Sequence, residues 1–334
     1  MKILIIGKDG ADSLERNLAD VGQEFFSDEV KVLEFVPKLK IFRNMRSINF
    51  VLDSLSRTQW LNKCLNSRLS RLAEKYEPNA ILVMTGAANH VSGDFVSRAR
   101  IVLHSKIFCW FVDSSISITE GRFLFAGYDE IYFTDRGLLK YFSDTISSAK
   151  SVLFEGYHPR RHIVSTNFET QSYIAVVGSV RPDRAVLLEK LLIMGFNIRI
   201  FGPPIGDWYK GDLLRSVHQN RFLTYEDKCK VFNEAFCVLN TFHPSHLDAI
   251  NCRIFEAIAA GSVIISQYSA ALEDYFGKEA ILSYKSFSEL VAILSKLQSG
   301  LLNTEEQRKR VSKLREGNSL VDRYRRVFRE SNIF

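Results

Sequence analysis

The chain has 334 residues, 46% of them hydrophobic and 25% charged, and a formal net charge of +6. This length is enough for two domains that each bury a core, and no apolar run approaches the roughly 20 residues that cross a bilayer, which excludes a membrane-spanning protein. The strand-like run Lys2–Ile6 follows the first residue directly, so we expect no signal peptide.

The cysteines favour a reducing compartment. There are five of them, an odd number, and they are scattered along the chain without a C-x-x-C pair. A disulfide framework would need paired cysteines at close spacing. We therefore expect free thiols and a cytoplasmic protein.

Basic residues gather in Lys38–Arg46 and Arg308–Arg329, where they alternate with apolar side chains. One interpretation is a solvated helix face, whose long basic side chains cover apolar surface. The other is a surface that contacts anionic lipid headgroups, at the inner face of the cell membrane. A net basic charge also suits nucleic acid or a phosphorylated substrate, but we find no recognised nucleic-acid module and expect no such partner.

Strands and helices alternate along the first half of the chain. Apolar, β-rich runs are separated by helix-length amphipathic segments, such as Leu55–Tyr76 with its stripe of leucines. This alternation predicts a parallel sheet wrapped by helices. The expected strands are Lys2–Gly7, Val30–Val36, Ala80–Thr85, Ile107–Val112, Glu130–Thr134 and Ser151–Phe154.

The second half repeats the pattern. Its expected strands are Tyr173–Val177, Asn197–Phe201, Cys237–Phe242, Ser262–Gln267 and Ala280–Ser283, with helices at Asp183–Met194, Glu226–Ala235 and Asn251–Ala260. Between the halves, the polar segment His158–Thr170 has no clear periodicity and is the expected linker. We expect an α/β protein with domains at 1–160 and 171–316, a terminal helix in 317–334, and a ligand cleft between the domains.

Two segments resemble binding motifs but lack the required spacing. Gly7–Asp12 follows the first strand, yet Asp9 stands where a dinucleotide fingerprint needs room for a pyrophosphate. His243 and His246 flank Pro244 in a loop, without the helical spacing of a zinc site. The chain also has no D-x-D triplet to hold a cation against a diphosphate, so we expect chemistry without a metal or other cofactor.

Glycines and arginines follow two expected strands of the second half. Gly178 comes directly after Tyr173–Val177, and Arg181 and Arg184 come next, so a phosphate could approach the backbone and pair with a guanidinium. The alternative is an ordinary helix start capped by Asp183. Gly202 follows the next strand and has the same two interpretations.

The segment L-D-A-I-N-C-R-I-F-E-A-I-A-A-G-S, residues 247–262, groups polar side chains between two apolar runs. Asp248, Asn251, Arg253 and Glu256 would lie on the loop and first turns of a crossover helix, at the carboxyl end of a parallel strand, where open α/β sheets bind ligands. An arginine and helix-start amides hold a diphosphate, and a carboxylate accepts ribose hydroxyls. The alternative is an ion pair of Arg253 with Glu256 within the helix.

The pattern D-x-x-N-x-R-x-F-E-x-x-A-x-G, from Asp248 to Gly261, resembles the signature of group 1 glycosyltransferases of the GT-B fold, especially the CgeB-like (spore maturation protein) branch. Trp110–Asp113 and Glu155–Pro159 resemble other parts of that branch in the same order. The resemblance covers most of the chain from about residue 80. Its specific part is the segment from Asp248 to Gly261.

The resemblance implies two Rossmann-like, doubly wound domains that face each other across a cleft. The nucleotide sugar would bind the C-terminal domain and the acceptor the N-terminal one. A last helix, Asn318–Phe328, would cross back to the N-terminal domain. Retaining members of the wider superfamily carry an E-x7-E pair, and Asp248 stands here in place of the first glutamate.

The leading hypothesis is a metal-independent hexosyl- or deoxyhexosyltransferase of polysaccharide biosynthesis. It would move a sugar from a nucleoside diphosphate sugar to a hydroxyl of a glycan, a lipid-linked acceptor or a protein. Arg253 would stabilise the leaving diphosphate. Asp248 would contact the donor sugar, and Asp113 would be the base of an inverting reaction.

The donor-binding residues under this hypothesis are Gly178, Arg181, Arg184, Gly202, Asn251, Arg253 and Glu256. A second hypothesis is a catalytically inactive subunit that binds a nucleotide sugar or glycan in a surface-polysaccharide or spore-coat assembly. Transfer or hydrolysis of the donor distinguishes the two hypotheses.

Overall fold

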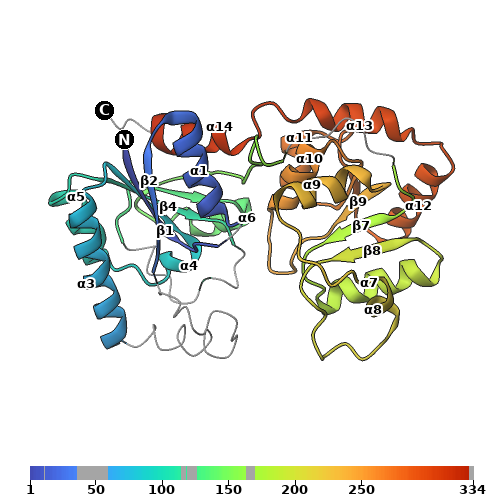
Figure 1. Ribbon diagram of the computed structural model, residues 1–334, viewed down its shortest axis with the longest axis horizontal. Coiled ribbons are helices and arrows are strands. Elements are labelled where there is room, and N and C mark those ends of the chain that lie inside the picture. The colour runs from blue at the N-terminus through green and yellow to red at the C-terminus, as the bar shows by residue number, and fades with distance from the viewer. Residues whose placement is uncertain (11, 36–58, 114–117, 119–125, 163–169, 331–334) are drawn as a thin grey trace. The chain divides into compact units, whose positions relative to one another are not determined.

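The computed structural model describes residues 1–10, 12–35, 59–113, 118, 126–162 and 170–330. The chain forms two compact units, drawn mainly blue to green and mainly yellow to red in Figure 1. Unit 1 consists of Met1–Phe154, Pro244–Ala249 and Leu320–Phe334. Unit 2 consists of Glu155–His243 and Ile250–Ser319.

These units divide the chain differently from the expected domains in three places: residues 155–160 and 317–319 lie in unit 2, and one internal segment lies in unit 1. Pro244–Ala249, which the sequence analysis assigned to the second domain, lies in unit 1. The expected linker His158–Thr170 falls partly outside the described residues, at 163–169.

Unit 1 is built on a parallel sheet, six-stranded among the described residues, in the order β2-β1-β3-β4-β5-β6. The four inner strands of this sheet are buried over most of their length and are largely apolar, whereas the two edge strands are partly exposed. The strands are β1 (Lys2–Gly7), β2 (Glu29–Glu34), β3 (Ala80–Met84), β4 (Lys106–Phe111), β5 (Glu130–Phe133) and β6 (Ala149–Val152).

Alternate residues of the unit 1 strands enter two separate cores. Leu4 and Ile6 of β1 pack with α3, α5 and α6, whereas Ile3 and Ile5 pack with α1 and α14 on the opposite face. The helices described in unit 1 are α1 (Leu14–Phe26), α3 (Gln59–Tyr76), α4 (Thr85–Ala88), α5 (Gly93–Ile101), α6 (Arg136–Phe142) and α14 (Leu320–Arg325). The first residues of the expected helix Leu55–Tyr76 lie outside the described part of the chain.

Unit 2 has a second parallel sheet, five-stranded in the part of the chain that the structure describes, in the order β11-β10-β9-β7-β8. Its strands are β7 (Ile174–Val177), β8 (Ile198–Phe201), β9 (Cys237–Asn240), β10 (Ile264–Gln267) and β11 (Leu282–Tyr284). Its helices are α7 (Pro182–Ile193), α8 (Leu213–Val217), α9 (Tyr225–Glu234), α10 (Cys252–Ala260), α11 (Ala270–Phe276), α12 (Phe287–Gln298) and α13 (Thr304–Lys313).

The helices of unit 2 cover both faces of its sheet. Residues of α7, α8 and α12 share one core with alternate residues of β7, β8 and β9. Helices α9 and α10 lie against the opposite face in Figure 1, and α10 packs on β9, β10 and α9. Because all five strands are parallel, the loops that follow them emerge at one edge of the sheet, which is the edge where such folds bind ligands.

The sequence-based prediction of the fold class is confirmed. Both sheets are parallel and every expected strand is present, with ends that differ from the prediction by one or two residues. The helix expected at Asn251–Ala260 is α10, with Asn251 as its N-cap residue. Among the described residues, no helix is both long and apolar enough to cross a bilayer.

The C-terminal segment completes the core of unit 1. Leu320, Tyr324 and Phe328 are buried against α1 and the sheet, and Gly22 lets α1 approach Tyr324 closely. The Tyr324 hydroxyl donates a hydrogen bond of 2.7 Å to Asp28 Oδ2. Helix α14 continues into a π-helical turn, Arg326–Glu330, so the predicted return of Asn318–Phe328 to the first domain is observed as part of the fold.

Removal of the Phe328 side chain tests this packing. The ring is fully buried, so Phe328→Ala should lower the free energy of unfolding by about 3–5 kcal/mol through lost contacts and a cavity. Arg325→Ala, an exposed position in the same segment, should change it by no more than about 0.5 kcal/mol. Urea unfolding of both variants measures the difference, and equal stabilities would contradict the packing.

Candidate functional site

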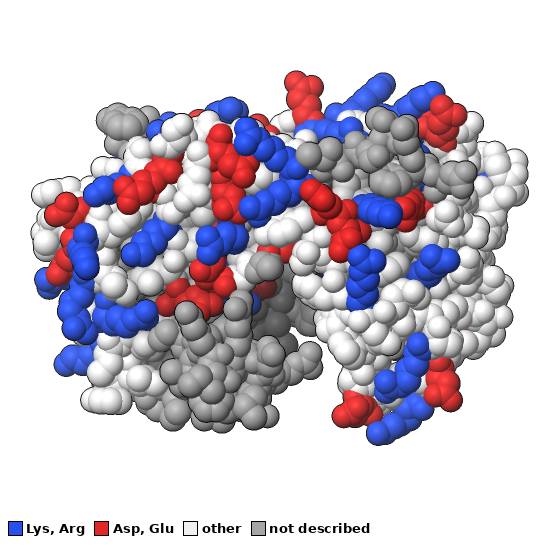
Figure 2. Space-filling model, in the orientation of Figure 1, with Lys and Arg blue, Asp and Glu red and all other residues white. Residues whose placement is uncertain are grey.

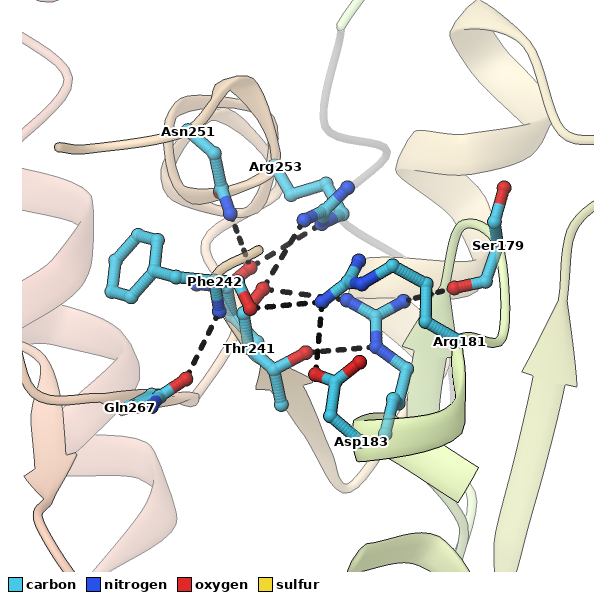
Figure 3. Close-up of polar contacts among 10 residues, drawn as sticks. Ser179, Arg181, Asp183, Thr241, Phe242, Asn251, Arg253 and Gln267 are labelled. Carbon is cyan, nitrogen blue, oxygen red and sulfur yellow. Dashed lines mark hydrogen bonds and ion pairs between the residues drawn. The ribbon is translucent and has the colours of Figure 1, made fainter. Parts of the chain in front are cut away.

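Three arginines converge at the carboxyl edge of the unit 2 sheet (Figure 3). Arg181 and Arg184 follow β7, and Arg253 lies in the first turn of α10. Their guanidinium groups surround Thr241 and Phe242, the residues that follow β9. We call these five residues, together with Gly178, Gly202, Asn240 and Asn251, the arginine site.

Arg184 is buried although its hydrogen-bond acceptors among the described residues are neutral. It is 2% exposed, and its Nε donates to Thr241 Oγ1 at 2.8 Å while Nη1 donates to the Ser179 carbonyl at 3.0 Å. Burial, followed by the positive charges of Arg253 and Arg181, lowers its pKa to about 9. This guanidinium therefore sits where an anion would stabilise it.

Arg253 is held by the loop after β9. Its Nε donates to Asn240 Oδ1 and its Nη2 to the Thr241 carbonyl, each at 3.3 Å. Asn251 Nδ2 donates to the same Asn240 oxygen at 3.0 Å, and Asn240 Nδ2 donates to Ser266 Oγ at 3.0 Å. Asn240 thus orients both Asn251 and Arg253 at the start of α10.

Arg181 begins α7 as its N-cap residue, with Pro182 in the first turn. Its Nη2 donates to the Phe242 carbonyl at 2.8 Å and lies 3.2 Å from Asp183 Oδ2. The alternative prediction of a helix start capped by Asp183 is wrong, because Asp183 lies inside the first turn and no side-chain cap is present. Arg181 is the arginine of this site that has a carboxylate partner.

The two glycines make room for this arrangement. Gly178 has φ +113, and a Cβ placed there would lie 3.2 Å from Arg253 Nη1. Gly202 has φ +153, and its Cβ would lie 2.6 Å from the Gly178 carbonyl oxygen, which is closer than atoms can approach. Residues with side chains would separate β7 from β8 at this edge or push the arginines out.

The arginine site carries positive charge that its own surroundings do not neutralise. Neither Arg184 nor Arg253 forms an ion pair with any described residue. Helix α10 has no side-chain cap, so its first amides and its dipole add to the positive potential. Guanidinium groups and helix-start amides are the groups that bind phosphate oxygens in proteins.

Glu256 lies one turn after Arg253 but pairs with a different residue. Lys228 Nζ of α9 donates to Glu256 Oε1 at 2.7 Å, and His162 Nε2 is 3.8 Å from the same oxygen. The alternative prediction of an ion pair between Arg253 and Glu256 is wrong, since the Arg253 guanidinium contacts Asn240 and Thr241 instead.

The Glu256 carboxylate is buried and charged. Burial acts to raise its pKa, but Lys228, His162 and Arg253 together bring the pKa below the usual value of 4.5. Oε1 is bound by Lys228, whereas Oε2 is buried and has no hydrogen-bond partner among the described residues. A buried acceptor without a partner costs free energy unless a ligand donates to it.

Lys228 is a residue that the sequence analysis missed. It lies on the buried stripe of α9 with Val231 and Phe232, three and four residues further on. A lysine at a position that the helical period assigns to the core needs a buried partner. That conflict between residue type and period is the signal that could have identified it.

Asp248 belongs to unit 1. Its Oδ2 is 2.7 Å from Arg136 Nη2, and its backbone N–H donates to Asp135 Oδ1 at 2.8 Å. The expectation that Asp248 acts together with Asn251, Arg253 and Glu256 stays a prediction. Asp113, the other carboxylate expected to take part in catalysis, is exposed just after β4 in unit 1.

Asp135 fixes the segment Pro244–Ala249 on unit 1. Its carboxylate accepts hydrogen bonds from the backbone N–H groups of Leu247, Asp248 and Gly137, each at 2.8–2.9 Å. Burial acts to raise its pKa, but His246 and these amides bring it below the usual value. The position of Asp248 is therefore set by a buried carboxylate of unit 1.

The expected metal-free chemistry stays a prediction. Within either unit by itself, the described residues bring no three metal-ligating side chains together. His246 of the H-x-x-H segment lies 3.7 Å from Asp135 Oδ2. It thus belongs to the cluster that holds Pro244–Ala249 on unit 1.

The basic segment Arg308–Arg329 binds largely its own chain. Arg308 donates to the carbonyls of Asn233 and Ala235, Arg323 to that of Phe154, and Arg329 lies 2.6 Å from Asp28. These arginines cap and connect secondary structure, which accounts for part of the basic excess of the segment. The other basic segment, Lys38–Arg46, lies outside the described residues.

Inorganic pyrophosphate tests the charge of the arginine site. It should raise the melting temperature of the protein, since a ligand at 100 times its Kd adds about 2.7 kcal/mol of stability. Arg184→Met and Arg253→Met should each reduce this shift, and Arg310→Met, an exposed arginine paired with Glu306, should not. A shift that is equal in all four proteins would rule out this site for the anion.

Mutation of Glu256 tests its buried ion pair. Glu256→Ala should lower the free energy of unfolding by about 3–5 kcal/mol, because it removes the carboxylate that lies 2.7 Å from the buried ammonium group of Lys228. The double variant Lys228→Met/Glu256→Leu should lose less. Glu234→Ala, which removes the half-buried partner of the exposed Lys230, should lose no more than about 1 kcal/mol. Urea unfolding ranks the three variants, and a double variant as unstable as Glu256→Ala would contradict the explanation.

Known proteins resemble the chain in part of its sequence and in its fold. Residues 181–330, which include Arg184, Arg253 and Glu256, match the glycosyl transferase-like family. No curated protein shows a significant sequence match to the chain.

Solved structures resemble the whole chain. A lipopolysaccharide outer core galactosyltransferase, WaaB, has a TM-score of 0.62 at 12% identity, over 98% of this chain and 99% of its own. A UDP-forming α,α-trehalose-phosphate synthase from Burkholderia vietnamiensis has 0.64 at 12% identity, over 98% and 96%. T4 phage BGT, solved with its UDP-glucose substrate, has 0.52 at 13% identity, over 98% and 99%. The chain therefore has the GT-B fold, and its residues 181–330 match the glycosyl transferase-like family.

Proposed function

We propose that the protein is a glycosyltransferase that moves a hexosyl or deoxyhexosyl group from a nucleoside diphosphate sugar to a hydroxyl of a glycan, a lipid-linked acceptor or a protein. The observation that carries the proposal is the pair of guanidinium groups, Arg184 and Arg253, that lack an ion-pair partner among the described residues. Both arginines lie in the first turn of a helix that follows a strand, which is where parallel α/β sheets bind phosphates. The pattern from Asp248 to Gly261 supports the CgeB-like branch of the group 1 enzymes.

The leaving group of this reaction is a nucleoside diphosphate, which gains negative charge as the glycosidic bond breaks. Arg253, the first amides of α10 and the buried Arg184 supply positive potential that is already in place before the reaction. Arg181 and Gly178 complete the loop after β7, where the missing Cβ lets a phosphate approach the backbone. Positive charge from the protein itself supports a reaction without a metal.

The remaining donor contacts follow from the chemistry of their side chains. The free Oε2 of Glu256 suits a ribose hydroxyl, which donates a hydrogen bond to a buried carboxylate. Asn251 keeps a buried Oδ1 without a partner among the described residues, which suits a hydroxyl of the donor.

Unit 1 contains the two carboxylates that we propose for catalysis. Asp113 is exposed at the end of β4 and is the proposed base if the reaction inverts the anomeric configuration. Asp248 is the proposed carboxylate for the sugar, with Arg136 holding its Oδ2. One finding favours a second candidate, a subunit that binds nucleotide sugar without turnover: Asp248 is already engaged by an arginine of unit 1.

We place this reaction in the cytoplasm, with contact to anionic membrane as part of the proposal. The outer side of α3 supports this contact, because it exposes Lys63, Arg71 and Lys75. Trp60, near the start of the helix, is 75% exposed. Figure 2 shows basic side chains along this edge of unit 1, interspersed with acidic ones.

Transfer assays test the proposed activity. The purified protein should release nucleoside diphosphate from one sugar of a panel carrying UDP, GDP or dTDP, and should do so in excess EDTA. Arg253→Ala should lower kcat by about 10²–10³-fold, because an electrostatic contact to the leaving group is lost. Arg310→Ala should leave the rate unchanged. Donor binding without any release or transfer would instead establish the non-catalytic subunit.

A further inference from the structure

Helix α9 carries a lysine, Lys228, on its buried face. Lys228 is 8% exposed, and its ammonium group is 2.7 Å from Glu256 Oε1. A buried ammonium is retained only with a close partner, because the loss of its hydration must be offset. An apolar residue would pack on this stripe of α9 at lower cost.

Other contacts fix the distance between α9 and α10. Asn233 Nδ2 of α9 donates to the Ala260 carbonyl at 2.8 Å, and Ser262 Oγ donates to the Phe232 carbonyl at 2.6 Å. These bonds join the carboxyl end of α9 to the end of α10. The lysine pair joins the same two helices nearer the start of α10, so Lys228 Nζ has a fixed place relative to Glu256.

The pair leaves the two oxygens of Glu256 in different states. Oε1 accepts the hydrogen bond from Lys228, and His162 Nε2, at 3.8 Å, is too far to form another. Oε2 is buried and has no hydrogen-bond partner in the described part of the chain. Arg253, one turn before Glu256 on α10, belongs to the arginine site. A carboxylate oxygen with free lone pairs thus lies one helical turn from the groups suited to a diphosphate.

We propose that Lys228 is the positioning residue of this donor site: by holding Oε1 it presents Oε2 of Glu256 to a ribose hydroxyl of the nucleoside diphosphate. This inference rests on the proposed function. It assigns separate tasks to the cationic residues of the site, since the arginines bind the diphosphate and the lysine acts on the ribose only through Glu256. Lys228 itself touches no ligand.

Two ligands separate the tasks. A nucleoside diphosphate carries both the diphosphate and the ribose, whereas inorganic pyrophosphate carries only the former. Calorimetry gives the affinity for pyrophosphate and for whichever of UDP, GDP and dTDP binds the wild-type protein most tightly. A loss of folding or of the arginine site would weaken the binding of both ligands. A loss of the ribose contact would weaken the binding of the nucleoside diphosphate alone.

The variants are matched to the pair. Lys228→Met should weaken the nucleoside diphosphate by about tenfold or more, the value of a hydrogen bond to a charged group, and leave pyrophosphate unchanged. Lys228→Arg keeps a cationic donor and should restore most of the affinity. Lys230→Met removes an exposed lysine of the same helix, paired with Glu234 at 3.7 Å, and should change neither ligand.

A double variant guards against failure to fold. Lys228→Met/Glu256→Gln removes both buried charges, so it should fold and show the same selective loss. Wild-type affinity for the nucleoside diphosphate in Lys228→Met or in the double variant overturns the inference alone. An equal loss of affinity for both ligands in the double variant does the same. A wild-type protein that binds none of the three nucleoside diphosphates overturns the proposed function and the inference with it.

Discussion

Positive charge without a matching carboxylate is the constraint on which unit 2 depends. Arg184 and Arg253 are held by carbonyl, hydroxyl and amide oxygens of the loops after β7 and β9, and no described residue forms an ion pair with either. Burial, followed by the positive charges of the neighbouring guanidinium groups, lowers the pKa of Arg184 and costs stability. A fold keeps such an arrangement at a place where an anionic ligand offsets the cost.

The rest of the site follows from how those arginines are positioned. Gly178 and Gly202 let β7 and β8 end close enough together for the guanidinium groups to fit. Asn240 orients the start of α10, and the pair of Lys228 with Glu256 joins α10 to α9. Polar contacts thus fix helices α9 and α10 relative to each other and to the loop after β9. The apolar faces of the helices fix their distance from the sheet.

Much of this could be predicted from the sequence. The alternation of apolar runs and amphipathic segments located the strands and helices, because each depends on a period within a few residues. The glycines and arginines after the strands were also found, since parallel strands place such residues at one edge. The boundary of the units at Pro244–Ala249 was not predicted, because it depends on Asp135 accepting amide hydrogens from Leu247 and Asp248.

The sequence by itself determined the α/β class, the order of the elements and the loops that carry the candidate site. Only the tertiary structure decided which charged groups meet. Asp248 pairs with Arg136, 112 residues away, and Glu256 pairs with Lys228, 28 residues away, rather than with Arg253 on its own helix. Periodicity assigns a side chain to a face of its helix or strand. The cation that pairs with a carboxylate depends on burial and on how whole helices pack, and no local pattern contains that information.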